Sequence, residues 1–276
     1  MKLIKQILSF IFIIILSISM LCSFLVFIFS NTILNKDYIL NKMEECNYYE
    51  QTYLDMNEIL EQYIGPSGLD EEVLKDIYTE NKIKDDINTT VNTIFTGEEK
   101  AIETEAIREK LNKNIYKNYN IKDNEKEAIT NFENTIINEY TKQITHHDYL
   151  YSLENYIPTA NKIIANLKII MPFTTCIIIV ILIILNIKKK NRIMQGILIG
   201  FLSASFTIII MGIIININVK FESILILNET FSNLVRNIIN ELLKIFQNVG
   251  IITAILSTIF LIATNTVYEI KQRKLK

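Results

Sequence analysis

Residues 7–30 read ILSFIFIIILSISMLCSFLVFIFS and contain no charged side chain. Seventeen of these 24 residues are Ile, Leu, Phe or Val, and each favours insertion at the centre of a bilayer by roughly 0.3–0.6 kcal/mol. As an α-helix, the run is about 36 Å long, enough to cross a hydrocarbon core of about 30 Å. It therefore predicts a first transmembrane helix.

Three later runs have the same apolar character and predict further transmembrane helices over residues 169–187, 193–215 and 249–268. None of the four runs contains an ionisable Asp, Glu, Lys, Arg or His, the residues that mark ion and proton pathways at membrane depth. The fold class that we expect is an all-α integral membrane protein with four transmembrane helices. An extracytoplasmic helical bundle is inserted between the first helix and the second.

A cleaved signal peptide is the alternative for the first run, because Lys2 and Lys5 precede it. The run is longer than the about 7–15 apolar residues of a signal peptide. No small-residue cleavage site follows it. An uncleaved membrane anchor is therefore the preferred interpretation.

The charged residues predict the orientation. Residues 31–168 hold 26 acidic and 15 basic side chains, whereas the other 138 residues hold four acidic and 13 basic ones. Basic residues flank the predicted spans in the N-terminal segment 1–6, in the turn 188–192 and in the tail 269–276. The positive-inside rule places these three segments, and so both termini, in the cytoplasm. The residues that we expect to determine the topology are Lys188, Lys189, Lys190, Arg192, Lys271, Arg273 and Lys274.

Residues 31–168 are then expected to form an extracytoplasmic helical domain. Gly65-Pro66, Gly97 and Pro158 interrupt its helical pattern. The expected helices cover about 33–63, 69–97, 98–119 and 123–157. A division of the second helix into two at the polar stretch 79–86 is the alternative. Each has one apolar face, which favours a compact bundle. This layout resembles the external four-helix sensor bundle of bacterial chemoreceptors, but it lacks their long cytoplasmic signalling region.

The second external loop, residues 216–248, carries an apolar stripe that predicts an amphipathic helix beginning near Asn228. One interpretation is a helix that binds a partner or lies in the membrane interface. The other is a helix that docks on the protein's own bundle or extends the fourth span outward. The residues of the stripe are Leu227, Phe231, Leu234, Ile238, Leu242 and Ile245.

Small residues at spacings of four form a row in the third span and another in the fourth. Such rows let helix backbones approach closely in lipid. We expect the two rows to pack against each other, with another subunit as the alternative partner. The residues of the rows are Gly196, Gly200 and Ala204, and Gly250, Ala254 and Thr258.

The sequence offers little catalytic chemistry. His146 and His147 are adjacent, and neighbouring residues of a helix point about 100° apart, so the two cannot easily share one metal ion. No phosphate-binding loop, nucleophile elbow, zinc-protease motif or calcium loop is present. We therefore expect no enzyme activity, no cofactor and no metal site.

These features predict a non-enzymatic binding, sensor or accessory module whose external domain engages a protein, a peptide or an envelope component. The alternative is a subunit of a membrane transporter or a homo-oligomeric channel. The expected partners are the lipid bilayer and a protein of the membrane or envelope, with a homo-oligomer left open. Nucleic acid is not expected, because the external domain is acidic. The 29 Asn and only eight Ala suggest an AT-rich bacterial genome, and so a bacterial plasma membrane.

Overall fold

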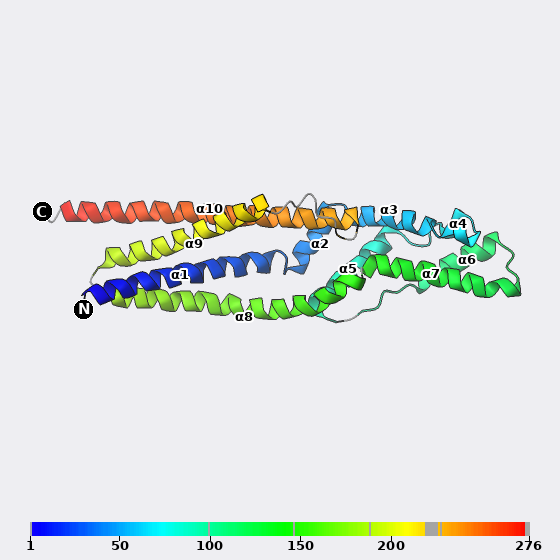
Figure 1. The fold of residues 1–276 in the computed structure, drawn as a ribbon, viewed down its shortest axis with the longest axis horizontal. Helices are drawn as coiled ribbons and strands as arrows, with labels where there is room; N and C mark the ends of the chain where they lie inside the picture. Colours follow the sequence, from blue (N-terminus) through cyan, green and yellow to red (C-terminus); the bar gives the residue numbers. More distant parts are fainter. Residues whose placement is uncertain are drawn as a thin grey trace. The chain divides into compact units, whose positions relative to one another are not determined.

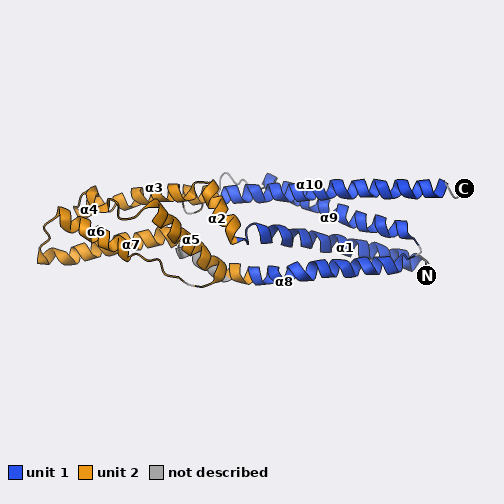
Figure 2. Cartoon of the chain, turned by 180° about the vertical axis from the view of Figure 1, so that it is seen from behind, with its two compact units in different colours: residues 1–35, 161–224, 235–276 blue, residues 36–160, 225–234 orange. Residues whose placement is uncertain are grey.

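The computed structural model describes residues 2–98, 100–145, 147–187, 189–218, 226 and 228–273. Within these ranges the regular elements are helices, and the one β-type pairing is an isolated bridge between Ile226 and Asn228 (Figure 1). The chain divides into two compact units (Figure 2). Unit 1 comprises residues 1–35, 161–224 and 235–276, and unit 2 comprises residues 36–160 and 225–234.

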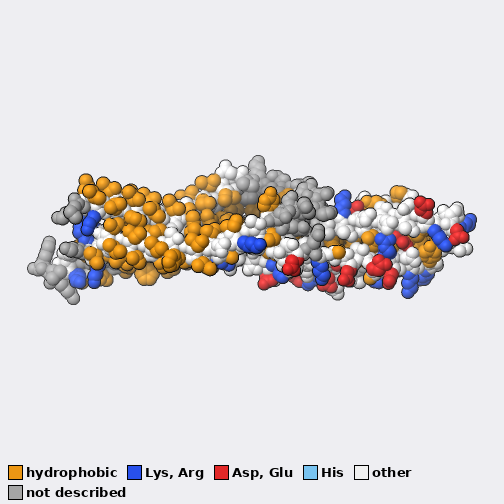
Figure 3. Space-filling view, turned by 90° about the horizontal axis from the view of Figure 1, so that it is seen from below, with side chains coloured by type: hydrophobic (Ala, Val, Ile, Leu, Met, Phe, Trp, Pro, Cys, Tyr) orange, Lys and Arg blue, Asp and Glu red, His pale blue; other side chains and the backbone are white. Residues whose placement is uncertain are grey.

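Four helices are long and apolar enough to cross a membrane, and they supply the helical part of unit 1. They are α1 (Lys2–Asn31), α8 (His147–Leu185), α9 (Lys190–Asn218) and α10 (Glu229–Arg273). Large apolar side chains cover their surface (Figure 3), and Ile169 and Ile217 are 75% and 73% exposed. Apolar surface of this extent is unusual for a protein that faces water.

The helices extend beyond the predicted spans. The helix α8 passes through Pro158, where we expected the helix of the external domain to end, and it stops at Leu185, two residues before the predicted end of the second span. The helix α10 begins at Glu229, twenty residues before the predicted start of the fourth span. In both α8 and α10, amphipathic turns therefore precede the apolar run within one continuous helix.

Helices α1 and α9 approach each other closely. An ideal Cβ atom on Gly200 would lie 2.9 Å from Cδ2 of Leu16, and one on Gly196 would lie 3.0 Å from Cδ1 of Ile13. Leu16 is also part of a buried apolar cluster with Ile178 and Leu182 of α8. The glycines of α9 thus allow α1 to approach closely, and α1 also packs against α8.

This arrangement corrects the predicted pairing of the two small-residue rows, because Gly196 and Gly200 face α1 rather than α10. The contact between α9 and α10 uses Gly250, whose Cβ atom would lie 2.5 Å from Cγ1 of Ile209 and 3.0 Å from the carbonyl oxygen of Ser205. Of the other predicted residues, Ala204 is fully buried, Ala254 is half-buried and Thr258 is exposed.

Unit 2 is a bundle of shorter helices around its own apolar core. The helices are α2 (Lys36–Glu45), α3 (Tyr48–Glu61), α4 (Ile64–Ser67), α5 (Glu80–Thr96), α6 (Glu105–Asn118) and α7 (Lys126–Thr145), with the 3₁₀ turns η1 (Glu71–Leu74) and η2 (Asp123–Glu125). The first residues of α8 and α10 also belong to it. Its largest fully buried side chains are Met56, Leu60, Ile83, Ile107, Leu111, Ile115, Ile136 and Tyr140.

Two helix boundaries of unit 2 differ from those predicted. The expected helix 33–63 is divided at Asn47, which has a left-handed φ of 52°. The expected helix 69–97 divides at its polar stretch into η1 and α5, because the Thr79 hydroxyl accepts a hydrogen bond of 3.2 Å from the Lys82 N–H and caps a new helix there. The helix expected to begin at residue 98 begins at Glu105.

Candidate functional site

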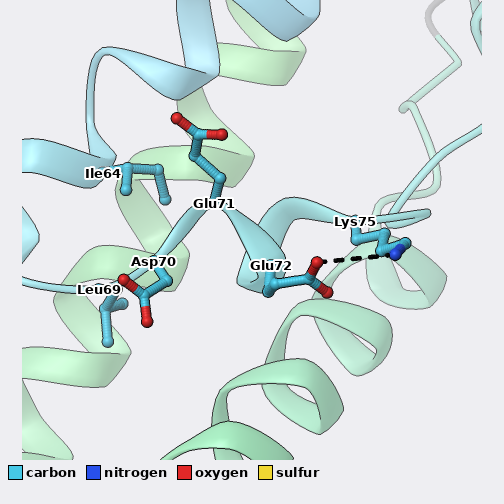
Figure 4. A pocket seen from close by; sticks show the side chains of 6 residues that line it. All are labelled: Ile64, Leu69, Asp70, Glu71, Glu72 and Lys75. Carbon is cyan, nitrogen blue, oxygen red and sulfur yellow. Dashed lines mark ion pairs between the residues drawn. The ribbon is translucent and has the colours of Figure 1, made fainter.

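A hollow of about 560 Å³ lies on unit 2 where α4 leads into η1 (Figure 4). Ile64 and Leu69 form its apolar part, and three consecutive carboxylates, from Asp70 to Glu72, line the rest together with Lys75. Glu72 forms an ion pair of 3.6 Å with Lys75, and both side chains are more than 60% exposed. A pair so exposed contributes little to stability. The hollow is therefore an open surface with three negative charges and one positive charge.

Helix α6 holds the backbone around the hollow in place. The Tyr119 hydroxyl, just after α6, donates a hydrogen bond of 2.8 Å to Oδ2 of Asp70 and accepts one of 2.7 Å from the Asp70 N–H. The bond to the carboxylate raises the pKa of the Tyr119 hydroxyl. The Asn114 amide donates to the carbonyl oxygens of Val73 and Lys75, at 3.1 and 2.8 Å. These bonds order a turn that is too short to be stable alone.

A buried polar cluster lies inside unit 2. Asp86 is only 6% exposed, and its carboxylate accepts hydrogen bonds of 2.5 and 2.7 Å from the Lys82 ammonium and one of 2.7 Å from the Tyr140 hydroxyl. Burial and the neighbouring carboxylate raise the pKa of Tyr140 far above its ordinary value. A charge that is buried, paired and hydrogen-bonded in this way stabilises a particular packing arrangement.

Aromatic rings connect this cluster to α3. The ring of Tyr78 lies 5.3 Å from that of Tyr140 and 5.8 Å from that of Tyr53, and its hydroxyl donates a hydrogen bond of 2.7 Å to Oδ1 of Asn57. Burial raises the pKa of Tyr78 above its usual range. The three rings therefore connect α3 to α7 through Tyr78, which lies just before α5.

The first turn of α10 is attached to α3 within unit 2. The Thr230 hydroxyl donates a hydrogen bond of 2.7 Å to Oδ2 of Asp55, and the Asn228 amide donates one of 3.4 Å to the same oxygen. Asn228 also caps the helix, since its Oδ1 accepts from the Phe231 N–H at 2.8 Å. The carboxylate of Asp55 is favourably placed beside the positive end of the helix dipole.

The predicted partner-binding stripe is covered by the chain itself. Leu234 is 2% exposed. Leu242 and Ile245 pack against a buried cluster that includes Ile28 of α1 and Phe246, and Phe231 and Ile238 are half-buried. The structure therefore favours the interpretation in which this helix extends the fourth span. Leu227 lies outside the described residues.

Basic residues gather at one end of unit 1. The start of α1, the α8–α9 turn and the end of α10 lie at this end (Figure 1). Lys189, Lys190, Arg192, Lys271 and Arg273 are exposed there. Lys188 and Lys274, which we predicted to act with them, are outside the described ranges.

Among the described residues, no group of three or more His, Cys, Asp or Glu side chains is arranged to hold a metal ion. His146 lies outside them. The hydroxyls of Ser205 and Thr207 in α9 and of Thr253 and Thr258 in α10 donate to carbonyl groups of their own helices.

Comparison with known proteins reveals no relative. No protein-family model matches the chain, and no curated protein or solved structure is significantly similar to it. Function is therefore inferred from the arrangement of the residues.

Proposed function

We propose that this protein is a non-enzymatic binding module of a bacterial plasma membrane, in which unit 1 spans the bilayer and unit 2 lies outside the cytoplasm. Unit 2 engages a protein, a peptide or an envelope component. Unit 1 anchors it and responds to its conformation. Both termini and the α8–α9 turn are cytoplasmic.

The distribution of charge supports this topology. Five exposed basic residues of unit 1, Lys189, Lys190, Arg192, Lys271 and Arg273, lie at the end where α1 begins and α10 ends, and the positive-inside rule assigns that end to the cytoplasm. Four crossings then leave the long segment between α1 and α8 on the opposite side. The same topology assigns the start of α10 to the outside, where it belongs to unit 2.

The observation that carries the proposal is the attachment of α10 to Asp55. The first residues of α10 belong to unit 2, and the same helix continues to Arg273 in unit 1 without an interruption. A ligand that moves α3 would thus act directly on a membrane-spanning helix. The acidic hollow is a suitable place for such a ligand, and its charge favours a basic segment of a protein or peptide.

Cysteine accessibility tests the topology. The three natural cysteines, Cys22, Cys46 and Cys176, are first replaced by Ser. On intact cells, an impermeant thiol reagent should label Ser67→Cys beside the hollow and should label Lys190→Cys only after the cells are permeabilised. Labelling of Lys190→Cys alone on intact cells would reject the proposed orientation.

Site-specific crosslinking tests the binding role. A photoreactive residue at Glu71 in the hollow should capture a partner in native membranes, whereas one at Glu127, exposed at the start of α7, should not. Equal capture at both positions would show that the hollow has no special role. The alternative function, a transporter subunit or a homo-oligomeric channel, has no specific observation in its favour.

A further inference from the structure

A second cavity, of about 250 Å³, lies within unit 1 at its basic end. Its walls come from the first turns of α1, from the α8–α9 turn and from the first turns of α9. Gln6, Ser9, Asn186 and Gln195 make one part of the lining polar, and Arg192 adds a guanidinium group. Among the described residues, none that lines the cavity is acidic.

Two of the amide groups that line the cavity, those of Asn186 and Gln195, are held in defined orientations. The Asn186 amide donates hydrogen bonds of 2.9 Å to the Ser9 hydroxyl and 3.2 Å to the Leu182 carbonyl oxygen. The Gln195 amide donates one of 2.6 Å to Oδ1 of Asn265 in α10. These bonds hold the two amides in place before any ligand binds, which lowers the entropic cost of binding.

The charge of the cavity selects an anion. Arg192 is exposed, and it forms no ion pair with a carboxylate among the residues that the structure describes. Lys189 and Lys190 belong to the same turn. A guanidinium group matches the oxygens of a phosphate with paired N–H donors and remains charged at any physiological pH.

The size and the apolar rim identify the kind of anion. The cavity is smaller than the about 300–1,000 Å³ of pockets that enclose a whole drug-sized ligand, so it accepts only part of a larger molecule. Phe10 and Ile199 also line it, are 64% and 48% exposed, and join it to the apolar surface of α1 and α9. A ligand with a phosphate at one end and hydrocarbon at the other matches both the basic, polar lining and the apolar rim of the cavity.

We propose that this cavity binds the headgroup of an anionic glycerophospholipid, with the phosphate at Arg192 and the acyl chains along Phe10 and Ile199. The inference rests on the proposed membrane location of unit 1. Basic pockets between transmembrane helices on the cytoplasmic side are a known place for anionic lipid headgroups. A soluble phosphate ester shares the headgroup chemistry but makes no use of the apolar rim.

The test uses the full chain in detergent micelles, with bound lipid counted by native mass spectrometry. Phosphatidylglycerol and phosphatidylcholine with the same acyl chains are the two lipid probes, and glycerol 1-phosphate is the soluble competitor. We expect phosphatidylglycerol to bind at least tenfold more tightly than phosphatidylcholine. Glycerol 1-phosphate should not displace it at equal concentration.

Arg192→Gln should weaken phosphatidylglycerol binding about tenfold, because the charged hydrogen bonds to phosphate are lost. Lys190→Gln removes one charge from the same turn but does not line the cavity, so it should change the affinity less than threefold. Gln6→Ala keeps the net charge and should weaken binding several-fold. If Arg192→Gln fails to fold, the affinity of Gln6→Ala for phosphatidylglycerol tests the inference instead.

Equal effects of Arg192→Gln and Lys190→Gln, with no effect of Gln6→Ala, would overturn the inference in favour of unspecific charge attraction. Displacement by glycerol 1-phosphate at equal concentration would overturn the lipid assignment in favour of a free phosphate ester. Release of the chain from membranes by alkaline carbonate would instead refute the proposed membrane location. A chain that stays in the membrane without lipid selectivity refutes the cavity assignment alone.

Discussion

The Tyr140 hydroxyl of α7 donates a hydrogen bond of 2.7 Å to Oδ2 of Asp86 of α5, and Tyr140 is fully buried while Asp86 is 6% exposed. The two residues are 54 positions apart in the sequence, and α6 and the 3₁₀ turn η2 lie between them. Because Asp86 also pairs with Lys82, the bond joins a buried ion pair to the aromatic core of unit 2. Its loss should therefore affect stability more than the loss of an exposed tyrosine hydroxyl.

Tyr140→Phe should lower the free energy of unfolding by about 1–3 kcal/mol, because the buried Oδ2 of Asp86 loses one of its two donors and keeps only Lys82. Tyr116→Phe is the matched control, since Tyr116 is 45% exposed, and it should change stability by no more than about 0.5 kcal/mol. Denaturant unfolding of the full chain in micelles, followed by tyrosine fluorescence, measures both. Equal stabilities of the two variants would contradict the role of the bond.

High pH should destabilise unit 2. Burial raises the pKa of Tyr49 to about 12, and burial also raises the pKa of Tyr78 and Tyr140 above their usual range. A tyrosine whose pKa is higher in the folded state stabilises that state fully below its unfolded pKa of about 10, and this contribution is lost as the pH rises further. Stability should therefore fall above about pH 10.

Tyrosinate absorbance measures this directly. In the folded chain, part of the tyrosine absorbance should titrate only above pH 11, and denaturant should bring all of it to about pH 10. The drop in stability above pH 10 should be smaller in Tyr140→Phe than in the parent protein, which separates this tyrosine from the general loss of lysine charge. A single titration near pH 10 in the folded chain would refute the buried environment.

Asp55→Ala should loosen the start of α10, because the Thr230 hydroxyl and the Asn228 amide lose their acceptor. Hydrogen exchange at the amides of residues 231–232 should accelerate about tenfold, which corresponds to about 1.4 kcal/mol of local stability. Glu58→Ala, at an exposed position of the same helix α3, should leave that exchange unchanged. Protection that survives Asp55→Ala would remove the main support for coupling through α10.

The four helices that are long and apolar enough to cross a membrane could be predicted, because a local run of sequence contains both properties. The helices that pack against the small residues could not be predicted in this way. A spacing of four residues tells which face of α9 permits close approach, but α1 and α10 both have large side chains that can occupy such a face. In the structure, Gly196 and Gly200 face Ile13 and Leu16 of α1, although the spacing equally allowed a contact with α10.

The polar contacts of unit 2 were harder to predict from the sequence. Ile136, Tyr140 and Ile144 recur every four residues, which indicates a buried face, but this spacing gives no sign that Asp86 accepts a bond from Tyr140, since that depends on how α5 packs against α7. Lys82, four residues before Asp86, was the one local hint. Asp55 gave no signal at all, because its partners lie more than 170 residues away.

The close contacts of the glycines in unit 1 predict how strongly substitution of each by alanine destabilises the chain. Gly250→Ala should destabilise the chain by about 1–3 kcal/mol, because its Cβ atom would lie 3.0 Å from the Ser205 backbone oxygen, which cannot move aside as a side chain can. Gly200→Ala should cost less, since the Leu16 side chain can adjust. Gly65→Ala has open space around it and should be neutral or slightly stabilising. Thermal unfolding in micelles should rank the variants in this order, and a Gly200→Ala protein less stable than Gly250→Ala would mean that α9 packs more tightly on α1 than on α10.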